Sequence, residues 1–139
     1  MKIMAIDYGD AHTGIAISDP TGFLTGFSTP INAYRPEVVA EQVAALCREH
    51  GVEELVLGHP INMDGTRGPR SEKAQAMKAL LEETASLPVV LWDERRTTSV
   101  AHQILMNSGK NAQQRKKVVD AVAATLILEG YLTYKKSHP

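Results

Sequence analysis

The sequence predicts an α/β fold: a five-stranded mixed sheet, three antiparallel strands followed by two parallel strands, with helices on both faces. Two observations lead to this prediction. Residues 1–28 hold short apolar runs separated by Gly, Asp and Pro, which is typical of strands joined by tight turns. From residue 36 onward, stretches with apolar residues at a spacing of three to four alternate with short apolar runs, which indicates strands reached through helices.

Three strands are expected first. Residues 3–7 form a nearly continuous apolar run, as in a strand covered on both faces. Residues 13–18 alternate around Ile15 and Ile17 and follow a short turn, which predicts a hairpin, and residues 22–28 form the third strand. Strands joined by such short connections should be antiparallel.

Helices and two further strands follow. Pro36 suits a first helical position and Gly51 a helix end, so a helix is expected between them. The other expected elements are a strand at 54–58, a helix at 69–85, a strand at 89–92, a helix from Thr97 or Thr98 to Gly109, and a last helix at 115–134 with Val119, Val122, Ala123, Leu126 and Ile127 on its inner face. No repeat or linker divides the chain, so one domain, 1–139, is expected.

Composition fits a soluble globular protein. The 139 residues include 15 Lys and Arg, 16 Asp and Glu, and one cysteine, Cys47. A single thiol without an intrachain partner favours a reducing compartment. The apolar runs are too short to cross a bilayer, and the start of the chain has no secretory pattern, so a cytoplasmic location is expected.

Charge is distributed unevenly along the chain. Residues 1–60 carry 3 basic and 8 acidic side chains, whereas residues 61–139 carry 12 basic and 8 acidic ones. Basic clusters of this kind either bind phosphate or form a solvated surface. The basic residues expected to contact nucleic acid are Arg67, Arg70, Arg95, Arg96, Lys110, Arg115, Lys116 and Lys117.

Acidic residues lie where an open α/β sheet places its functional cleft, at the carboxyl ends of parallel strands. Asp7 ends the first expected strand, and Asp93 and Glu94 end the fifth. Asp120 borders the inner face of the last helix, where small alanines allow close approach to the sheet. Each has a structural alternative: a turn cap for Asp7, ion pairs with the adjacent arginines for Asp93 and Glu94, and a solvent-facing helix start for Asp120. Converging carboxylates would require cations, and oxygen-only ligation suits Mg²⁺ or Mn²⁺.

Four motifs resemble the YqgF family, whose members are bacterial ribonuclease-H-like proteins regarded as pre-16S rRNA nucleases and earlier as Holliday junction resolvases. The motifs span almost the whole chain in the family's order: Asp7-Tyr8-Gly9 with residues 14–19, Gly58-His59-Pro60 with residues 62–66, residues 93–98, and residues 120–124 with 126–128. The resemblance implies a catalytic and metal-binding set of Asp7, Glu94 and Asp120, with Asp93 as a neighbour that could substitute or assist.

The sequence departs from related junction resolvases after the fourth strand. Those proteins carry an acid there, whereas this chain has Gly58-His59-Pro60, so the second acid must come from the fifth strand. His59 is either a supporting residue that contacts phosphate or the leaving group, or a surface histidine without a catalytic role.

The leading hypothesis is a metal-dependent nuclease that acts on structured RNA, processing the 5′ end of pre-16S rRNA. The alternatives are a resolvase of branched DNA, a non-catalytic nucleic-acid-binding protein of ribosome assembly, and an ATP-binding phosphotransferase suggested by Asp7-Tyr8-Gly9 followed by Gly14. Expected partners are nucleic acid and ribosomal precursor particles, and a monomer or weak homodimer is expected.

Overall fold

The computed structural model describes residues 1–19, 25–59, 68–93 and 112–137. Five strands form one sheet in the order β3-β2-β1-β4-β5. The elements are β1 (Lys2–Asp7), β2 (His12–Ser18), β3 (Thr25–Asn32), α1 (Pro36–His50), β4 (Val52–His59), α2 (Pro69–Ala85), β5 (Val89–Asp93) and α4 (Ala112–Ser137).

Strand directions confirm the predicted mixed sheet. β1 pairs antiparallel with β2, and β2 pairs antiparallel with β3. β1 and β4 are parallel, as are β4 and β5. β1, β4 and β5 therefore end at the same edge of the sheet, where the functional cleft of an open α/β sheet lies.

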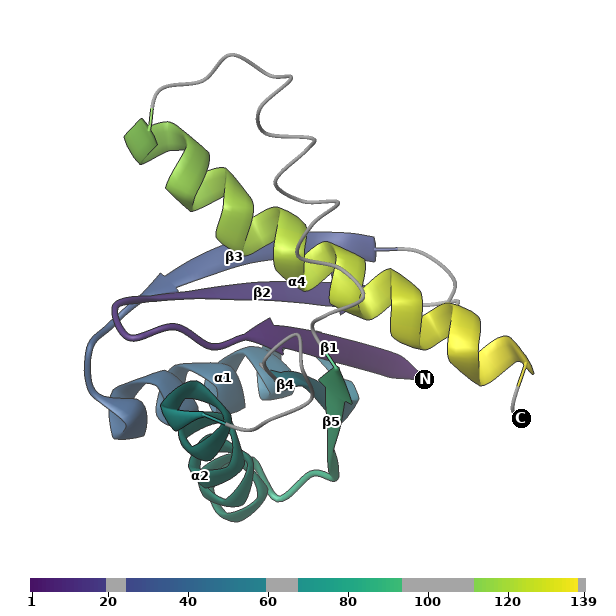
Figure 1. Cartoon of the computed structure of the whole chain (residues 1–139). Coiled ribbons are helices and arrows are strands. Elements are labelled where there is room, and N and C mark those ends of the chain that lie inside the picture. Colours follow the sequence, from purple (N-terminus) through teal and green to yellow (C-terminus); the bar gives the residue numbers. More distant parts are fainter. Residues whose placement is uncertain (20–24, 60–67, 94–111, 138–139) are drawn as a thin grey trace.

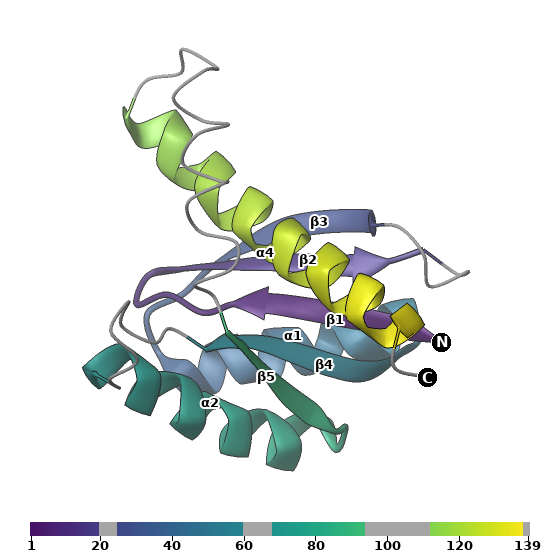
Figure 2. The ribbon, with the colours of Figure 1, turned by 45° about the vertical axis from the view of Figure 1, so that its right-hand side comes forward.

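Helices cover both faces of the sheet, as predicted. Figures 1 and 2 show α1 and α2 on one face and α4 crossing the other. Each face has its own apolar core: Met4, Ile6 and Leu57 pack with residues of α1 and α2, whereas Ala5, Val56 and residues of α4 form the second cluster. Because alternate residues of a strand point to opposite faces, a residue's position in a strand decides which helix layer it meets.

The third strand differs from its prediction. It was expected at 22–28, but β3 runs to Asn32, beyond Pro30. Proline lacks an N–H and is tolerated on edge strands, and β3 is an edge strand. The start of the predicted strand and the predicted helix ending at Gly109 lie outside the described residues.

Helix ends follow the predicted signals. α1 has Pro36 in its first turn, and Gly51 at its end adopts a φ of 72°, a conformation that suits glycine. α2 begins at Pro69 and ends at Ala85, as predicted.

The inner face of α4 was predicted only in part. Ala123 and Ile127 are buried, as expected, but Leu126 is only partly buried. Among the described side chains of α4, Ala124, Leu128, Tyr131 and Leu132 are also buried, whereas the predicted Val119 and Val122 lie outside that described part. The buried stripe thus extends about one turn further toward the end of the chain than predicted.

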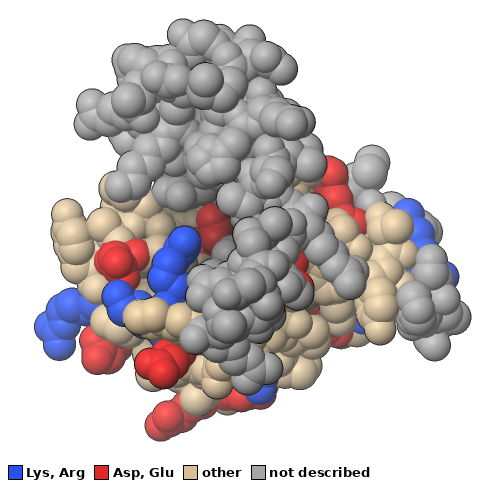
Figure 3. Space-filling view, in the orientation of Figure 1, with Lys and Arg blue, Asp and Glu red and all other residues tan. Residues whose placement is uncertain are grey.

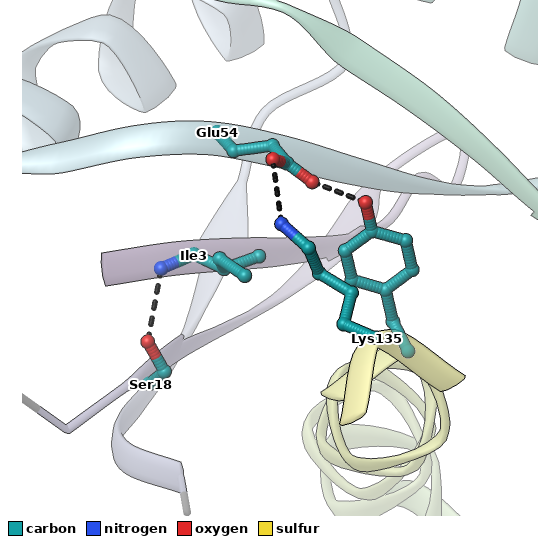
Figure 4. Close-up of polar contacts among 5 residues, drawn as sticks. Ile3, Ser18, Glu54 and Lys135 are labelled. Carbon is teal, nitrogen blue, oxygen red and sulfur yellow. Dashed lines mark hydrogen bonds and ion pairs between the residues drawn. The ribbon is translucent and has the colours of Figure 1, made fainter. Parts of the chain in front are cut away.

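A buried polar cluster fixes this end of α4 to the sheet (Figure 4). The Tyr131 hydroxyl donates a hydrogen bond to one carboxylate oxygen of Glu54 on β4, and the Lys135 ammonium lies 3.2 Å from the other. Glu54 is only 9% exposed, so these partners compensate for the loss of its hydration. Burial, with the neighbouring Glu54 carboxylate, raises the pKa of the Tyr131 hydroxyl.

Replacing Tyr131 with phenylalanine should therefore destabilise the protein. Tyr131→Phe removes a donor from a buried carboxylate, which typically costs about 1–3 kcal/mol. Urea denaturation should show this loss in the free energy of unfolding, whereas Tyr34→Phe, at a side chain that is 81% exposed, should change it by less than about 0.5 kcal/mol. Equal stabilities of the two variants would contradict the assigned role of the cluster.

Candidate functional site

Three polar residues end the three parallel strands. Asp7 is the last residue of β1, His59 of β4 and Asp93 of β5. His59 and Asp93 are direct neighbours in the parallel register, and Ile6 lies beside Leu57. The structure thus places the predicted strand-end residues Asp7, His59 and Asp93 along one edge of the sheet.

These residues do not all point to the same face. Ala5 belongs to the core under α4, so alternation places Asp7, two residues later, on the α4 face. Trp92 also packs on α4, through edge-to-face contacts with Tyr131 and Tyr134. Asp93 follows Trp92 directly and is therefore on the opposite face from Asp7.

Small residues surround Asp7 on its face. Gly14 of β2 lies directly opposite Asp7 in the antiparallel register. Next on the same face of β2 is Ala16, which packs with the fully buried Ala124 of α4. Because Ala16 and Ala124 are both small, α4 packs closely against β2 at this point.

The end of α4 is anchored near the start of β1. Tyr131 contacts Glu54, which lies beside Ile3. From there α4 runs back obliquely across β1, β2 and β3 (Figure 1), and Asp120 lies in its first part with only its backbone described. The approach of Asp120 to Asp7 stays a prediction.

His59 is a buried residue, so the alternative of a surface histidine is wrong. It is 6% exposed, and its Nε2 lies 2.6 Å from the hydroxyl of Ser71 on α2. The fully buried Ser71 also accepts a hydrogen bond from the Gln75 amide. The side chain of His59 thus links the end of β4 to α2 through a hydrogen bond.

Only part of the predicted set can be placed. Arg70 lies exposed in the first turn of α2. Five predicted residues lie outside the described residues: Arg67, Glu94, Arg95, Arg96 and Lys110. Four more lie in α4 with only their backbone described: Arg115, Lys116, Lys117 and Asp120. No group of three or more His, Cys, Asp or Glu able to hold a metal occurs among the described side chains, and the predicted ligand set stays a prediction because two of its members are not among them.

A pocket beside the β1–β2 turn was not predicted. This pocket has a volume of about 280 Å³, and its lining includes Tyr8, His12, Arg70 and Lys73. Its signal in the sequence is the three-residue spacing of Arg70 and Lys73, which places both on one side of a helix. Lys73 forms a 2.8 Å ion pair with Asp10. This contact lowers the pKa of the Asp10 carboxyl and raises that of the Lys73 ammonium.

Gly9 is needed for the tight turn between β1 and β2. A Cβ atom on Gly9 would lie 2.4 Å from the backbone oxygen of His12. Gly9→Ala should therefore lower the free energy of unfolding by about 1–3 kcal/mol, because backbone must move. In contrast, a Cβ on Gly130 of α4 meets Trp92 at an ordinary 3.4 Å, so Gly130→Ala should raise stability by up to about 1 kcal/mol. Thermal denaturation of the two variants should give shifts of opposite sign, and shifts of the same sign would contradict the packing described.

Comparison with known proteins identifies the family. The family model described as "RuvX: Holliday junction resolvase" matches residues 1–134. The chain belongs to the RuvX family. Relatives named "Putative pre-16S rRNA nuclease" include one from Clostridium botulinum, 43% identical over 95% of this chain and 96% of its own, and one from Bacillus subtilis, 41% identical over 95% of this chain and 97% of its own. The resemblance noted in the sequence motifs is confirmed, and this member of the RuvX family is a hydrolase of nucleic-acid ester bonds.

Solved structures show the same fold. Thermus thermophilus RuvC in complex with a Holliday junction substrate matches with a TM-score of 0.63 and 13% identity, over 98% of this chain and 96% of that one. Fowlpox virus resolvase in complex with Holliday junction DNA matches with a TM-score of 0.56 and 11% identity, over 99% of both chains. At these identities the likeness extends to the fold alone, and it confirms the ribonuclease-H-like architecture.

Proposed function

We propose that the protein is a metal-dependent nuclease that cleaves structured RNA and processes the 5′ end of pre-16S rRNA. The observation that carries the proposal is the position of Asp7, at the carboxyl edge of the central strand and on the face of the sheet that α4 covers. The names of the curated relatives supply the substrate.

The donor set fits a hard divalent cation. Asp7 and Asp120 are both carboxylates, and Asp7 is only partly buried, so an ion could reach it. Gly14 opposite Asp7 leaves that side of the carboxylate free of a bulky neighbour. Oxygen-only ligation of this kind suits Mg²⁺ or Mn²⁺.

The third carboxylate is assigned to Glu94. Asp93 ends β5 on the face opposite Asp7, so we assign the third ligand to the other acid of the pair. Glu94 would complete the ligand set with Asp7 and Asp120 or orient the attacking water. Bound ions would neutralise charge on the scissile phosphate and supply a nucleophilic water at neutral pH.

Positive charge on the chain would hold the substrate. The basic residues predicted from the sequence, Arg70 among the described ones, would contact backbone phosphates and position the strand over the acidic residues. His59, tied to Ser71, would support this edge of the sheet from the α2 side.

Branched DNA is the second candidate substrate, because the matching family model carries the resolvase description. We expect nucleic acid and ribosomal precursor particles as partners, a cytoplasmic location, and a monomer or weak homodimer. Among the described residues, no helix is long and apolar enough to span a membrane.

A substrate panel tests the proposal. The purified protein would be incubated with a pre-16S rRNA fragment carrying its 5′ extension and with a four-way DNA junction, in Mg²⁺, Mn²⁺ or chelator. We expect cleavage of the RNA only when a divalent ion is present. Cleavage of the junction but not of the RNA would indicate a resolvase instead. Salt-dependent binding of both substrates without cleavage products would indicate a non-catalytic assembly protein.

A further inference from the structure

Two adjoining pockets lie on the face of the sheet opposite Asp7. The first, of about 280 Å³, lies between the β1–β2 turn and the start of α2. The second, of about 250 Å³, lies between α2 and the segment that leads into α1. They share Tyr8, Asp10 and Lys73, so the Asp10–Lys73 ion pair stands where the two pockets meet.

The two pockets differ in chemistry. The walls of the first carry Arg70, Lys73 and His12, together with the carboxylate of Asp10, so positive charge is in excess there. The second presents the aromatic rings of Tyr8 and Tyr34, together with aliphatic side chains of α2 such as Ala76 and Leu80. A cationic pocket beside an aromatic one matches the two parts of a nucleotide, an anionic phosphate and a base with a π face.

The polar groups are suited to a phosphate. The Asp10–Lys73 pair is exposed, and surface pairs contribute little, so an anion can compete for the Lys73 ammonium. His12 is held by a 2.8 Å hydrogen bond between its Nδ1 and Asn32, with Nε2 as the other polar atom of its ring. Figure 3 shows acidic and basic side chains interspersed on this side of the molecule rather than one uniformly basic surface, which favours a localised contact.

The aromatic side chains are suited to a base. Tyr34 is 81% exposed, the most exposed of the large hydrophobic side chains that the structure describes. Tyr8 is partly buried and packs against the core. Tyr8 is therefore held in place by the core, whereas Tyr34 is accessible to a ligand. Any of the bases can stack on such rings, because every base has a π face.

Position links these pockets to the candidate catalytic edge. Tyr8 follows Asp7 directly in the chain but lies on the α1 and α2 side, packed against the core there. The pockets therefore begin one residue from the candidate catalytic carboxylate, at the carboxyl end of β1.

We propose that these two pockets bind one unpaired nucleotide of the substrate near the cleaved bond, with its phosphate at Arg70 and Lys73 and its base against Tyr8 and Tyr34. The inference rests on the proposed nuclease function and adds a feature of the substrate: a single-stranded segment adjoining a duplex. A paired nucleotide could not place its base against the tyrosines, so the protein should prefer duplexes with an unpaired extension over blunt duplexes.

Binding without catalysis tests this preference. Fluorescence anisotropy in chelator would compare a blunt RNA duplex with the same duplex carrying an unpaired extension. We expect the extension to tighten binding by the full-length protein, and Tyr34→Ala to weaken binding of the extended duplex about tenfold while leaving the blunt duplex unchanged. Tyr34→Phe keeps the ring and should behave as the unaltered protein.

The phosphate contact has its own measurement. Arg70→Ala should weaken binding of the extended duplex and reduce the slope of log affinity against log salt by about 0.7 to 1. The matched control is Lys78→Ala, because Lys78 lies on the same helix, is paired with Glu82 and does not line either pocket. An equal effect of Arg70→Ala and Lys78→Ala would overturn the phosphate contact.

The outcomes separate this inference from the proposed function. Metal-dependent cleavage together with no effect of the extension, or no effect of Tyr34→Ala, would overturn the nucleotide site and leave the nuclease assignment standing. A Tyr34-dependent preference for the extended duplex with no cleavage of any substrate would support the site and count against the nuclease.

Discussion

Asp7→Asn is expected to lower the cleavage rate by at least about a thousandfold and to leave the fold intact. Metal-assisted stabilisation of the transition state is worth several kcal/mol, which corresponds to a factor of this size. The substitution keeps the shape of the side chain and removes only its charge. Asp7 is partly exposed at a strand end, so the free energy of unfolding should change little.

Three measurements test this expectation. Single-turnover cleavage of the RNA substrate gives the rate, urea denaturation gives stability, and binding in chelator shows whether the substrate still docks. Binding by Asp7→Asn should be unchanged or slightly tighter, because a negative charge near the phosphates is lost. Glu37→Gln removes the same charge from an exposed position on α1 and should cleave normally. Undiminished metal-dependent cleavage by Asp7→Asn would refute the proposed site.

Local signals were enough to predict most of the architecture. Pro36 and Gly51 delimit α1, and both act through their own backbone: proline through its fixed φ, glycine through its tolerance of a positive one. The strand directions followed from the lengths of the connections. These features depend on a few neighbouring residues and can therefore be derived from one sequence.

Features that depend on distant residues were harder to predict. The prediction stopped β3 before Pro30, because only its place at the sheet edge makes that proline acceptable. The hydrogen bond from Tyr131 to Glu54 joins residues 77 apart in the chain, so no local pattern predicts it. His59, at the end of β4, was open to a surface interpretation because its partner Ser71 belongs to a different element, α2.

The candidate site was predictable in position but not in orientation. The rule that functional residues follow parallel strands selected Asp7 and the acids at the end of β5. It could not say which of Asp93 and Glu94 faces Asp7, because the direction of a side chain depends on what its strand packs against. The contact of Trp92 with α4 places Asp93 on the face opposite Asp7, and the role of Glu94 stays a prediction.

Glu94→Gln is expected to lower cleavage by at least about a hundredfold, whereas Asp93→Asn should stay within about threefold of the unaltered protein. Loss of a charged metal ligand removes about 3 kcal/mol or more of transition-state stabilisation. Asp93 lies on the opposite face from Asp7, so its carboxylate should not share a metal with it. Both variants lose one negative charge at neighbouring positions, and each therefore controls for the other in overall electrostatics.

The comparison would be made in single-turnover cleavage at several Mn²⁺ concentrations. A variant that has lost a metal ligand should need a higher Mn²⁺ concentration for activity. The activity of Glu94→Gln should therefore recover in part at high Mn²⁺, whereas the Mn²⁺ dependence of Asp93→Asn should not shift. The reverse order of the two variants would mean that the alternation of β5 breaks after Trp92, for example at a bulge, and would transfer the ligand role to Asp93. Equal losses would mean that both acids act at the site and would contradict a regular strand here, because two residues on opposite faces of a regular strand cannot contact the same ion.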